Sequence, residues 1–403
     1  MKKYLWLFIL VLLFPINCFA VDIDITSGNA ILYNMNDNSI LYEKDKDTKV
    51  SIASLTKMMT CIVALEHINN LDETIVLTNK DFYGLAEKNA SVAGFRVGET
   101  VTYRDLLYGL MLPSGADAAQ ALTRLISGSE EEFINLMNKK AEELKLKNTH
   151  FINPTGLDDE GHYSSVYDVS VIFKYALENE EFKKIVTSST YTTSNGRLTF
   201  KSTISKALAQ YNLSMDYLLG GKTGTTGDAG LCLASIAEKD NVKYMLVTVK
   251  APYSKTVPNN YNDQKKIYEY FMDNYGYKKV VEKGDTLVKI KTLYAKEDEV
   301  TIKAKDNIDK YLNNDFDKKK VEYKYNGKDT ITLDMNKGEK LGSIEVIYNG
   351  EVLEKIDVVL PNKQELDIMK YLSGHKVIVI SIISVVILLI FLLVFFKKKR
   401  KRK

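Results

Sequence analysis

Two kinds of hydrophobic pattern follow one another along the first half of the chain. Residues 30–34 and 39–43 have alternating apolar positions on either side of a polar turn, which predicts a β-hairpin. Residues 54–68 are apolar on nearly every side, which predicts a helix buried inside a domain. Ser129-x-x-Glu132 is a capping-box sequence ahead of an apolar run with helical spacing, so it predicts a half-buried helix.

The next part of the chain adds strands and one more helix. Residues 231–237 and 242–249 are short apolar runs on either side of a turn, and they predict two strands. Residues 267–275 have helical spacing. Helices and strands are therefore mixed in the segment between residues 21 and 275.

The pattern changes near Gly276, where helical spacing gives way to short strands and turns. Asn326-Gly327 and Asn349-Gly350 each stand between two alternating runs, and Asn-Gly in that position is a strong hairpin signal. We expect a small all-β domain over residues 276–362, followed by a linker over residues 363–376.

Both ends of the chain resemble targeting segments. Residues 1–20 have two lysines, an apolar run and a small residue at position 20, which is the order found in a secretory signal peptide. Residues 377–396 contain no charge, and twenty helical residues span ~30 Å, the thickness of a bilayer core. The basic residues 397–403 belong on the cytoplasmic side by the positive-inside rule. We expect a single-pass protein of the cell membrane whose main part is extracellular.

Composition excludes several classes of protein. Hydrophobic residues make up 45% and charged residues 27% of the chain, which is typical of a folded protein and not of a disordered one. The net charge of +3 depends on the nine basic residues of segments 2–3 and 397–403; without them it is −6. A chain with no basic face is not expected to bind nucleic acid. Cys61 and Cys232, which remain after signal cleavage, are interpreted as two buried thiols.

A serine and a lysine with helical spacing form the first candidate for chemistry. Ser54 and Lys57 are three residues apart, so on a helix their side chains share one face. A serine hydroxyl is a weak nucleophile until a base takes its proton, and a lysine is that base only when its pKa falls. In isolation, this spacing is more often a helix-capping serine beside an ordinary lysine.

Two further segments carry hydroxyl and amino groups. Ser114 lies between Pro113 and Gly115, which describes a turn that can present a hydroxyl or simply cap a helix. Lys222-Thr223-Gly224 comes just before the predicted strand 231–237, where a lysine and a threonine can bind a carboxylate. Each of these is weak by itself.

In this order the three motifs resemble those of penicillin-binding proteins and serine β-lactamases. The flanking residues resemble the serine-type D-alanyl-D-alanine carboxypeptidases, the low-molecular-mass penicillin-binding proteins of peptidase family S11. The matching segments are 53–60 (ASLTKMMT), 112–115 (LPSG), 153–157 (NPTGL), 161–164 (GHYS) and 221–226 (GKTGTT).

The resemblance extends over about residues 25–275 and continues more weakly into the β domain at 337–342 (KGEKLG). It implies an α/β (α+β) catalytic domain over residues 21–275, with an antiparallel sheet flanked by helices as in serine β-lactamases and transpeptidases. It also implies a small all-β domain after it and no cofactor or metal.

The resemblance implies a role for each residue of the three motifs. Ser54 attacks the bond between the last two D-alanines of a peptidoglycan stem peptide, and Lys57 is its general base. Ser114 relays the proton to the departing D-alanine. Lys222 and Thr223 hold the terminal carboxylate.

The remaining part of the third motif would complete the substrate site. Gly224 lets the substrate backbone lie close to the strand, and the N–H groups of Ser54 and Thr225 form the oxyanion hole. β-Lactam antibiotics would acylate Ser54 and leave slowly.

The sequence departs from the family pattern at three places. Ala116 stands where the second motif usually has asparagine, and Thr155 stands where a histidine is common. Asn260 precedes Asp263 where the family often has an arginine, so one carboxylate contact is expected to be missing.

Four other functions remain open at this point. A β-lactamase would need a deacylating glutamate, for which Glu131 with Asn135 has suitable spacing but a surface-helix pattern. A zinc carboxypeptidase would need metal ligands such as His162 and Asp168, which are more simply a loop histidine and a helix-capping aspartate. A D,D-endopeptidase would use the same site, and a catalytically idle wall-binding scaffold would explain Ala116.

Overall fold

The computed structural model describes residues 22–400 and divides into two compact units between Asp273 and Asn274. The predicted signal peptide, residues 1–20, lies outside the described residues, as does the end of the basic tail. Each unit is described by itself below.

The first unit mixes helices and strands, as the hydrophobic patterns predict. In chain order its elements are β1 (Asn29–Asn34), β2 (Ser39–Lys44), η1 (Ala53–Leu55), α1 (Thr56–His67), β3 (Thr74–Val76), η2 (Asn79–Phe82), β4 (Thr100–Thr102), α2 (Tyr103–Met111), α3 (Ala116–Ser127), α4 (Glu130–Glu143), α5 (Val166–Leu177), α6 (Glu180–Thr187), β5 (Thr190–Thr192), β6 (Thr199–Lys201), α7 (Thr203–Gln210), β7 (Leu218–Thr226), β8 (Gly230–Lys239), β9 (Val242–Ala251) and α8 (Asn259–Asn274).

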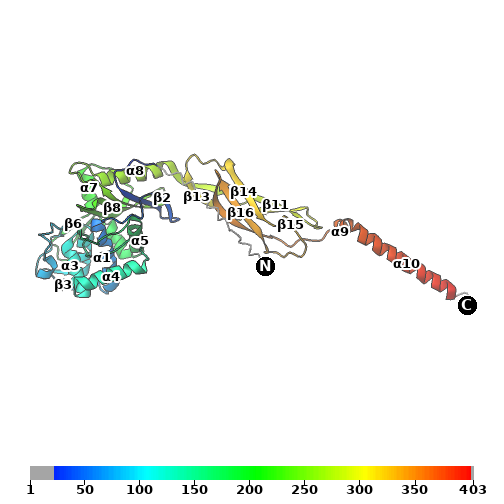
Figure 1. Ribbon diagram of the computed structural model, residues 1–403, viewed down its shortest axis with the longest axis horizontal. Helices are drawn as coiled ribbons and strands as arrows, with labels where there is room; N and C mark the ends of the chain where they lie inside the picture. Colours follow the sequence, from blue (N-terminus) through cyan, green and yellow to red (C-terminus); the bar gives the residue numbers. More distant parts are fainter. Residues whose placement is uncertain (1–21, 401–403) are drawn as a thin grey trace, which may run out of the picture. The chain divides into compact units, whose positions relative to one another are not determined.

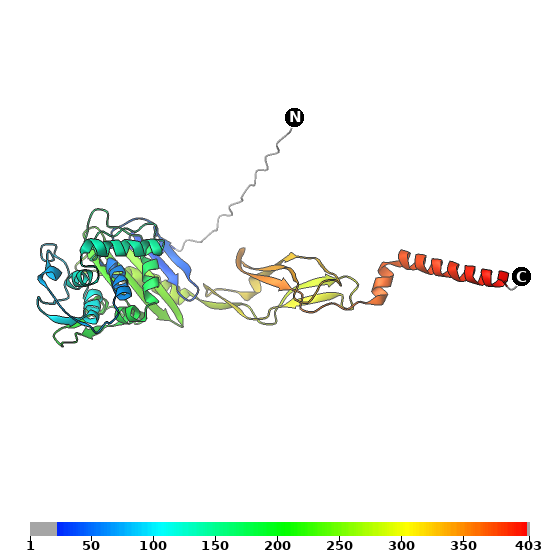
Figure 2. The ribbon, with the colours of Figure 1, turned by 90° about the horizontal axis from the view of Figure 1, so that it is seen from below.

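The centre of this unit is a five-stranded antiparallel sheet. Its strand order is β2-β1-β9-β8-β7, so β7 forms one edge. Helices α1 and α5 lie on one face, with α4 packed beyond them, and α8 covers the other face (Figure 1; Figure 2). This confirms the expected penicillin-binding-protein-like architecture of a sheet flanked by helices.

The two faces of the sheet follow from the alternation of side chains along its strands. On β8, Ala234 and Ile236 join the large apolar core that includes α1 to α6. The intervening Ser235 donates its hydroxyl hydrogen to Gln264 on α8, at 2.6 Å. Gln264 also donates to the carbonyl of Leu233, at 2.7 Å. Polar bonds therefore fasten α8 to a sheet face whose opposite side is held by apolar packing.

Most elements predicted for this unit are confirmed, with shifts at their ends. The hairpin of β1 and β2 forms with antiparallel pairing, and Ser129 caps α4 by accepting a hydrogen bond from the N–H of Glu132. The helix predicted over residues 267–275 begins earlier, at Asn259. Cys61 and Cys232 are buried free thiols, as predicted.

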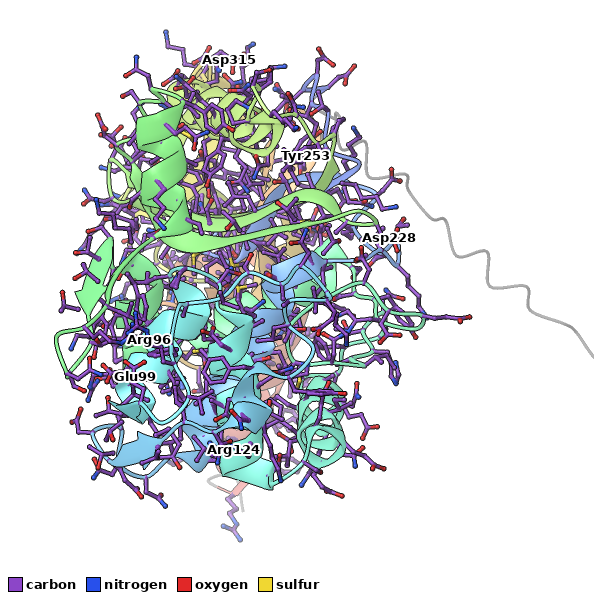
Figure 3. All side chains as sticks on the ribbon, turned by 90° about the vertical axis from the view of Figure 1, so that its left-hand side faces the viewer. Arg96, Glu99, Arg124, Asp228, Tyr253 and Asp315 are labelled. Carbon is purple, nitrogen blue, oxygen red and sulfur yellow. The ribbon has the colours of Figure 1, made fainter. Side chains whose placement is uncertain are left out.

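The helical layer is tied together by a buried ion pair. Arg124 on α3 reaches Asp81 in η2, with 2.6 Å between Nε and Oδ1 (Figure 3). Asp81 is fully buried, so its carboxylate needs this partner. The pair fixes the helix that follows Ser114 against the segment before it.

The second unit is an all-β body followed by two helices. Its elements are β10 (Tyr275–Val281), β11 (Thr286–Thr292), β12 (Glu299–Lys303), β13 (Ile308–Asn313), η3 (Lys318–Lys320), β14 (Val321–Gly327), β15 (Thr330–Ile331), β16 (Lys340–Tyr348), β17 (Glu351–Val359), α9 (Ile368–Gly374) and α10 (Lys376–Arg400). The sheets β10-β13, β12-β11-β15 and β14-β16-β17 enclose a separate apolar core.

One of the two predicted Asn-Gly hairpins is present and the other is absent. Strands β16 and β17 pair around Asn349 and Gly350, both of which have positive φ. The prediction for Asn326-Gly327 was wrong. These two residues lie inside β14 and pair with β16, while β15 pairs in parallel with β11. A Cβ at position 327 would meet the ring of Tyr325 at 2.5 Å, so this glycine serves a close approach and not a turn.

Helix α10 has the length and composition of a membrane span. The most apolar window within Lys376–Lys398 has a mean hydropathy of 3.6, and none of that window is buried within the protein. The chain turns between α9 and α10 at His375 (Figure 2). An unburied helix of this kind is consistent with anchoring in a bilayer.

Candidate active site

Ser54 and Lys57 meet at the start of the buried helix. Ser54 lies in η1, two residues before the start of α1, and Lys57 lies in the first turn of α1. Their side chains are joined by a hydrogen bond of 2.9 Å between Nζ and Oγ. The Nζ of Lys57 also donates to the carbonyl of Thr155, at 2.6 Å. The hydrogen bond to the Thr155 carbonyl thus holds the amine in contact with the Ser54 hydroxyl.

The surroundings of Lys57 favour its neutral form. The side chain is 2% exposed, and burial lowers the pKa of its ammonium to about 7. The negative charge of Asp117 opposes this by raising the pKa. A neutral amine has one lone pair, so at neutral pH a large fraction of Lys57 can accept the Ser54 proton while still donating to Thr155.

Ser114 and Lys222 form a second pair of the same chemical type. Lys222 on β7 is fully buried and donates to Ser114 Oγ at 2.8 Å and to the Thr223 carbonyl at 2.7 Å. Ser114 has a left-handed backbone, with φ of 65°, directly before Gly115, which caps α3. The serine is therefore not the cap itself; its hydroxyl is turned toward the sheet edge.

The charge of Lys57 acts on Lys222. Burial, and then the charge of Lys57, hold the pKa of Lys222 well below its usual value. Neither ammonium has a carboxylate in ion-pair contact among residues 22–400. For Lys57, burial is the main cause of the lowered pKa. The four side chains of Ser54, Lys57, Ser114 and Lys222 are thus brought together in two adjoining pairs.

The third motif lies on a strand of its own, which corrects its expected position at the entry to residues 231–237. Strand β7 pairs antiparallel with β8 and forms the sheet edge beside η1. A Cβ at Gly224 would lie 3.0 Å from both Ala53 Cβ and Ser54 N. Only glycine lets β7 approach the nucleophile this closely.

The hydroxyls of the third motif have local partners. Thr223 donates to the hydroxyl of Thr203, the first residue of α7, at 2.8 Å. Thr225 is exposed and donates to the Gly224 carbonyl at 2.8 Å. The side chains of Thr223 and Thr225 therefore lie along the outer edge of the sheet, on the strand that passes Ser54.

The backbone beside Ser54 is held in an unusual conformation. Ala53 has φ of 47°, a left-handed value that costs a non-glycine residue about 1 kcal/mol. Gly156, with φ of 77°, lies so close that a Cβ there would meet the Ala53 carbonyl oxygen at 2.0 Å. Packing of the 153–156 loop against η1 therefore maintains the position of Ser54.

Asp117 organises the loop that crosses the second motif. Its carboxylate accepts hydrogen bonds from the N–H groups of Ala93 at 2.8 Å, Gly94 at 3.1 Å and Phe95 at 3.3 Å. At the position where the family usually has asparagine, Ala116 is buried and its N–H donates to the Ser91 carbonyl at 2.7 Å. Asp117 does not take the place of the asparagine amide that is missing at position 116, because its carboxylate faces the 91–95 segment.

The other two departures from the family pattern also have a structural explanation. The Thr155 side chain donates to Asn153 at 2.9 Å, and the site uses its backbone carbonyl instead. Asn260 is buried and donates to the Cys232 carbonyl at 3.4 Å, while Asp263 accepts from Ser27 at 2.7 Å. Neither Asn260 nor Asp263 reaches the serine–lysine pairs through these bonds.

The alternative chemistries have weaker support. His162 accepts from the Ile152 N–H at Nδ1 and contacts Thr56 Oγ1 at Nε2, and burial lowers its pKa to about 4. Asp168 lies at the third position of α5, where Ser165 is the cap. No group of three potential metal ligands occurs within residues 22–400. Glu131 and Asn135 are exposed on α4, as expected for helix-surface residues.

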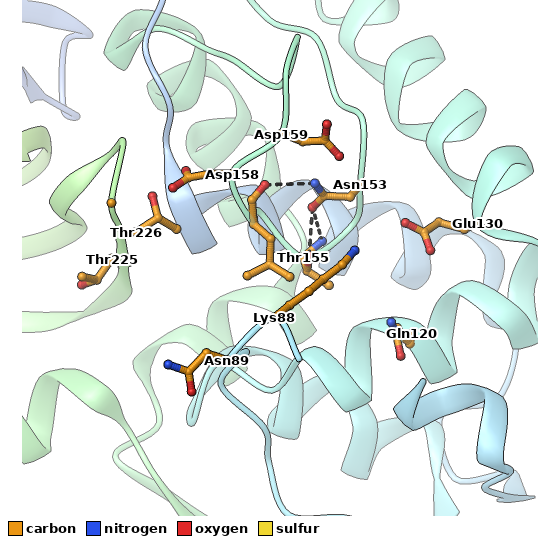
Figure 4. Close-up of a pocket in the computed structure, with 12 residues that line it drawn as sticks. Lys88, Asn89, Gln120, Glu130, Asn153, Thr155, Asp158, Asp159, Thr225 and Thr226 are labelled. Carbon is orange, nitrogen blue, oxygen red and sulfur yellow. Dashed lines mark hydrogen bonds between the residues drawn. The ribbon is translucent and has the colours of Figure 1, made fainter. Parts of the chain in front are cut away.

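A polar cavity of about 630 Å³ adjoins the third motif. Thr225 and Thr226 form one wall, and Asp158 and Asp159 rise above it, as Figure 4 shows. Lys88, Gln120 and Glu130 complete the opposite side. The lining includes Thr155, whose carbonyl accepts from Lys57, so the cavity shares this residue with the Ser54–Lys57 pair.

Three contributors to the site were not found from the sequence. The Thr155 carbonyl is backbone, and residue type gives no signal for it. Asp117 directly follows the second motif, and a buried acid at a helix start is a signal that could have found it. Thr203 lies near Thr223 only because α7 packs on β7, a tertiary contact that spacing does not encode.

Comparison with known proteins agrees with this geometry. The family model described as D-alanyl-D-alanine carboxypeptidase matches residues 17–253, and the one described as penicillin-binding protein 5, C-terminal domain, matches residues 275–365. The D-alanyl-D-alanine carboxypeptidase DacF of Bacillus subtilis (strain 168) is 32% identical over 336 residues, which cover 82% of this chain and 84% of that protein. A D-alanyl-D-alanine carboxypeptidase of Streptomyces sp. (strain K15) is 36% identical over 255 residues, covering 59% and 85%.

Solved structures share the same folds. The Streptomyces K15 DD-transpeptidase has a TM-score of 0.56 and 32% identity, covering 62% of this chain and 98% of that one. Penicillin-binding protein 5 from Haemophilus influenzae, with a TM-score of 0.63 and 24% identity over 85% of this chain and 98% of that one, shows the fold of both units. The chain is a serine peptidase that belongs to the D-alanyl-D-alanine carboxypeptidase family, peptidase S11, with the family's C-terminal β domain.

Proposed function

We propose that this protein removes the terminal D-alanine from peptidoglycan stem pentapeptides through an acyl-enzyme on Ser54. The observation that carries the proposal is the 2.9 Å contact between Lys57 Nζ and Ser54 Oγ, together with a Lys57 pKa of about 7. A base with its pKa near the working pH is the most effective proton acceptor for such a hydroxyl.

Acylation then proceeds by proton transfer and attack. The neutral Lys57 takes the Ser54 proton as Oγ attacks the carbonyl carbon of the penultimate D-alanine. Ser114 passes a proton to the departing amino group, because its hydroxyl is bonded to Lys222 at 2.8 Å. The C–N bond breaks, D-alanine leaves, and Ser54 holds the peptide as an ester.

Substrate binding uses the edge of the sheet. Lys222 and Thr223 attract the terminal carboxylate, and the backbone N–H groups of Ser54 and Thr225 donate to the developing oxyanion. The peptide lies extended along β7, an edge strand, which Gly224 lets pass beside Ser54. Water then hydrolyses the ester with Lys57 as base. A β-lactam would acylate the same Ser54 hydroxyl, and the ester that it forms would be hydrolysed slowly.

The location of the protein completes the proposal. Residues 1–20 would direct secretion, α10 would span the membrane, and the basic residues 397–403 would remain in the cytoplasm. The catalytic unit would then face the peptidoglycan outside the cell.

The full chain, purified in detergent, tests the proposal. Incubation with a pentapeptide ending in D-Ala-D-Ala should release free D-alanine, and a fluorescent penicillin should label the protein covalently. Ser54→Ala should abolish both signals, while Ser51→Ala, on the same segment, serves as the matched control. A wild-type protein that folds but neither releases D-alanine nor is labelled would favour an idle scaffold.

A further inference from the structure

His162 is a buried histidine that the proposed reaction does not use. It is 6% exposed, and its ring packs edge-on against Phe151, with ring centroids 5.8 Å apart. Its Nδ1 accepts from the Ile152 N–H at 3.2 Å, and its Nε2 lies 2.9 Å from Thr56 Oγ1. A neutral imidazole has one acceptor and one donor nitrogen, so Nε2 carries the proton and donates to Thr56. The ring therefore joins the segment at Ile152 to the first residue of α1.

The surroundings keep this ring neutral, as its two bonds require. Burial is the largest influence and lowers the pKa of His162 to about 4. The charges of Asp159 and Asp158 raise this pKa and the charge of His150 lowers it, but burial prevails. Both bonds are therefore present across the pH range in which Lys57, with its pKa of about 7, becomes neutral.

The ring joins the segment of the catalytic base to the segment of the carbonyl that holds this base. Thr56 directly precedes Lys57 on α1, and Ile152 lies three residues before Thr155. The Thr155 carbonyl accepts from Lys57 Nζ at 2.6 Å. His162 therefore makes a second connection between the same two segments.

The turn that begins with Asn153 is compact, so its attachment at one end determines where its carbonyls stand. Asn153 Oδ1 accepts from the N–H groups of Thr155 and Gly156, at 3.1 Å and 2.8 Å. Gly156 packs so closely on the Ala53 carbonyl that a Cβ has no room there. A shift of this turn would therefore move both the Thr155 carbonyl and the backbone just before Ser54.

From these contacts we infer that His162 is a positioning residue for the Ser54–Lys57 pair. By bonding to both segments, its ring fixes the turn of residues 153–156 on α1, and this turn holds Lys57 at the Ser54 hydroxyl. The inference rests on the proposed function and adds to it a residue outside the three catalytic motifs. A displacement of about 1 Å at a reacting group can cost about 10²-fold in rate, so a residue that only positions the base has a measurable effect.

Three substitutions in the full chain, purified in detergent, separate the two bonds of the ring. His162→Phe keeps an aromatic ring and loses both bonds, so kcat for a pentapeptide ending in D-Ala-D-Ala should fall by about 10- to 10²-fold, with KM within about twofold of wild type. His162→Asn keeps an oxygen near the place of Nδ1, and His162→Gln keeps an N–H near the place of Nε2. Each of these conservative variants should recover part of the lost kcat. If His162→Phe does not fold, the two conservative variants are compared with the wild type instead.

His150→Gln is the matched control. His150 is exposed, and its Nδ1 contacts the Gly161 carbonyl at 3.0 Å, in the same part of the chain. This change should leave kcat within about twofold of wild type, because His150 makes neither of the two bonds of His162. A folded His162→Phe variant with wild-type kcat would overturn the inference. An equal loss of kcat in the control would also overturn it, because a general loosening of the loop would then explain both results.

A titration of Lys57 distinguishes failure of this inference from failure of the proposed function. Lysine is labelled with carbon-13 at Cε, and the Lys57 signal, assigned by its loss in Lys57→Met, is followed with pH by NMR in the wild type and in His162→Phe. A loosened turn lets water reach Nζ, and because burial is what lowers the Lys57 pKa, this pKa should rise above about 7 in the variant.

The titration gives a result even without turnover. If the wild type releases no D-alanine and the Lys57 pKa still rises in His162→Phe, the proposed reaction fails and the positioning role of His162 stands. If the pKa is the same in both proteins, the inference fails whatever the activity.

Discussion

The two units differ sharply in what they bury. The catalytic unit encloses charged side chains, among them Lys57, Asp117 and Lys222, whereas Ser343 is the one polar residue that is buried in the described part of the β unit. Buried charges cost folding free energy unless they are paired. The carboxylates in the catalytic unit have partners, but the two lysines are bonded only to hydroxyls and carbonyls. Buried lysines without a carboxylate partner therefore distinguish the catalytic unit from the described part of the β unit.

Replacing the base should have the largest effect and should change activity and stability in opposite directions. Lys57→Met removes the proton acceptor, and general-base catalysis contributes about 10²- to 10⁴-fold, so D-alanine release should fall by about 10³-fold. The Lys57 pKa is about 7 in the folded state and 10.5 in the unfolded state, so between these values the unfolded state binds more protons. Burying this side chain therefore lowers the free energy of unfolding by on the order of 4 kcal/mol at pH 7. We expect a higher melting temperature, measured by calorimetry.

Two results would contradict this expectation for Lys57→Met. Retained D-alanine release would exclude Lys57 as the base. A lower melting temperature would mean that its bond to the Thr155 carbonyl outweighs the cost of burial.

Removing the charge of Asp117 should have an intermediate effect. In the wild type kcat/KM should fall tenfold for each pH unit below about 7, where Lys57 becomes protonated. Because the Asp117 charge raises the Lys57 pKa, Asp117→Asn should shift this acidic limb to lower pH. The amide also leaves N–H groups of the 93–95 loop without an acceptor, so stability should fall by about 1–3 kcal/mol.

Asp168→Asn is the matched control for this shift. Asp168 is equally buried and accepts from the Asn148 N–H at 2.7 Å, but its charge does not act on Lys57. Stability should fall and the pH profile should stay in place. If the acidic limb of the kcat/KM profile moves in both variants, or in neither, the charge of Asp117 does not control the Lys57 pKa.

A substitution in the β unit should have the smallest effect on catalysis. Ile344 on β16 is fully buried, and Ile344→Ala should cost that unit about 2–5 kcal/mol in free energy of unfolding. The kcat/KM for a soluble pentapeptide should stay within twofold of the wild-type value, because the Ser54 site lies in the other unit. A loss of activity in a folded variant would show that catalysis depends on the β unit as well as on the catalytic unit.

The sequence predicts more of the catalytic unit than of its surroundings. Helix α1 and the strands β8 and β9 follow from periodicity, because each buries a continuous apolar face. Strand β7 was missed as a separate strand because its glycines give it little apolar character. Its glycines instead lie close to η1 and to the end of α6, which are tertiary contacts that the local sequence does not indicate. Asn326-Gly327 was assigned to a turn because local propensity favours one, and tertiary pairing with β16 overrides it.

The site divides in a similar way. Ser54, Lys57, Ser114 and Lys222 were named from motifs, but their pairing into two hydrogen-bonded couples depends on residues far apart in the chain. Their roles in the reaction stay predictions until the variants above are measured. The Thr155 carbonyl and the left-handed Ala53 have no side-chain signature, so no inspection of residue types finds them.

Because β7 is the last strand of its sheet, the proposed function has the substrate peptide join the protein as a further strand. Main-chain hydrogen bonds accept any extended polypeptide and cannot distinguish a cell-wall peptide from other chains. In the proposed function, discrimination is therefore left to the end of the strand where Lys222 and Thr223 bind a free C-terminal carboxylate. An inhibitor that lies along β7 and also carries such a carboxylate would gain selectivity that a compact ring, bound only at Ser54, does not have.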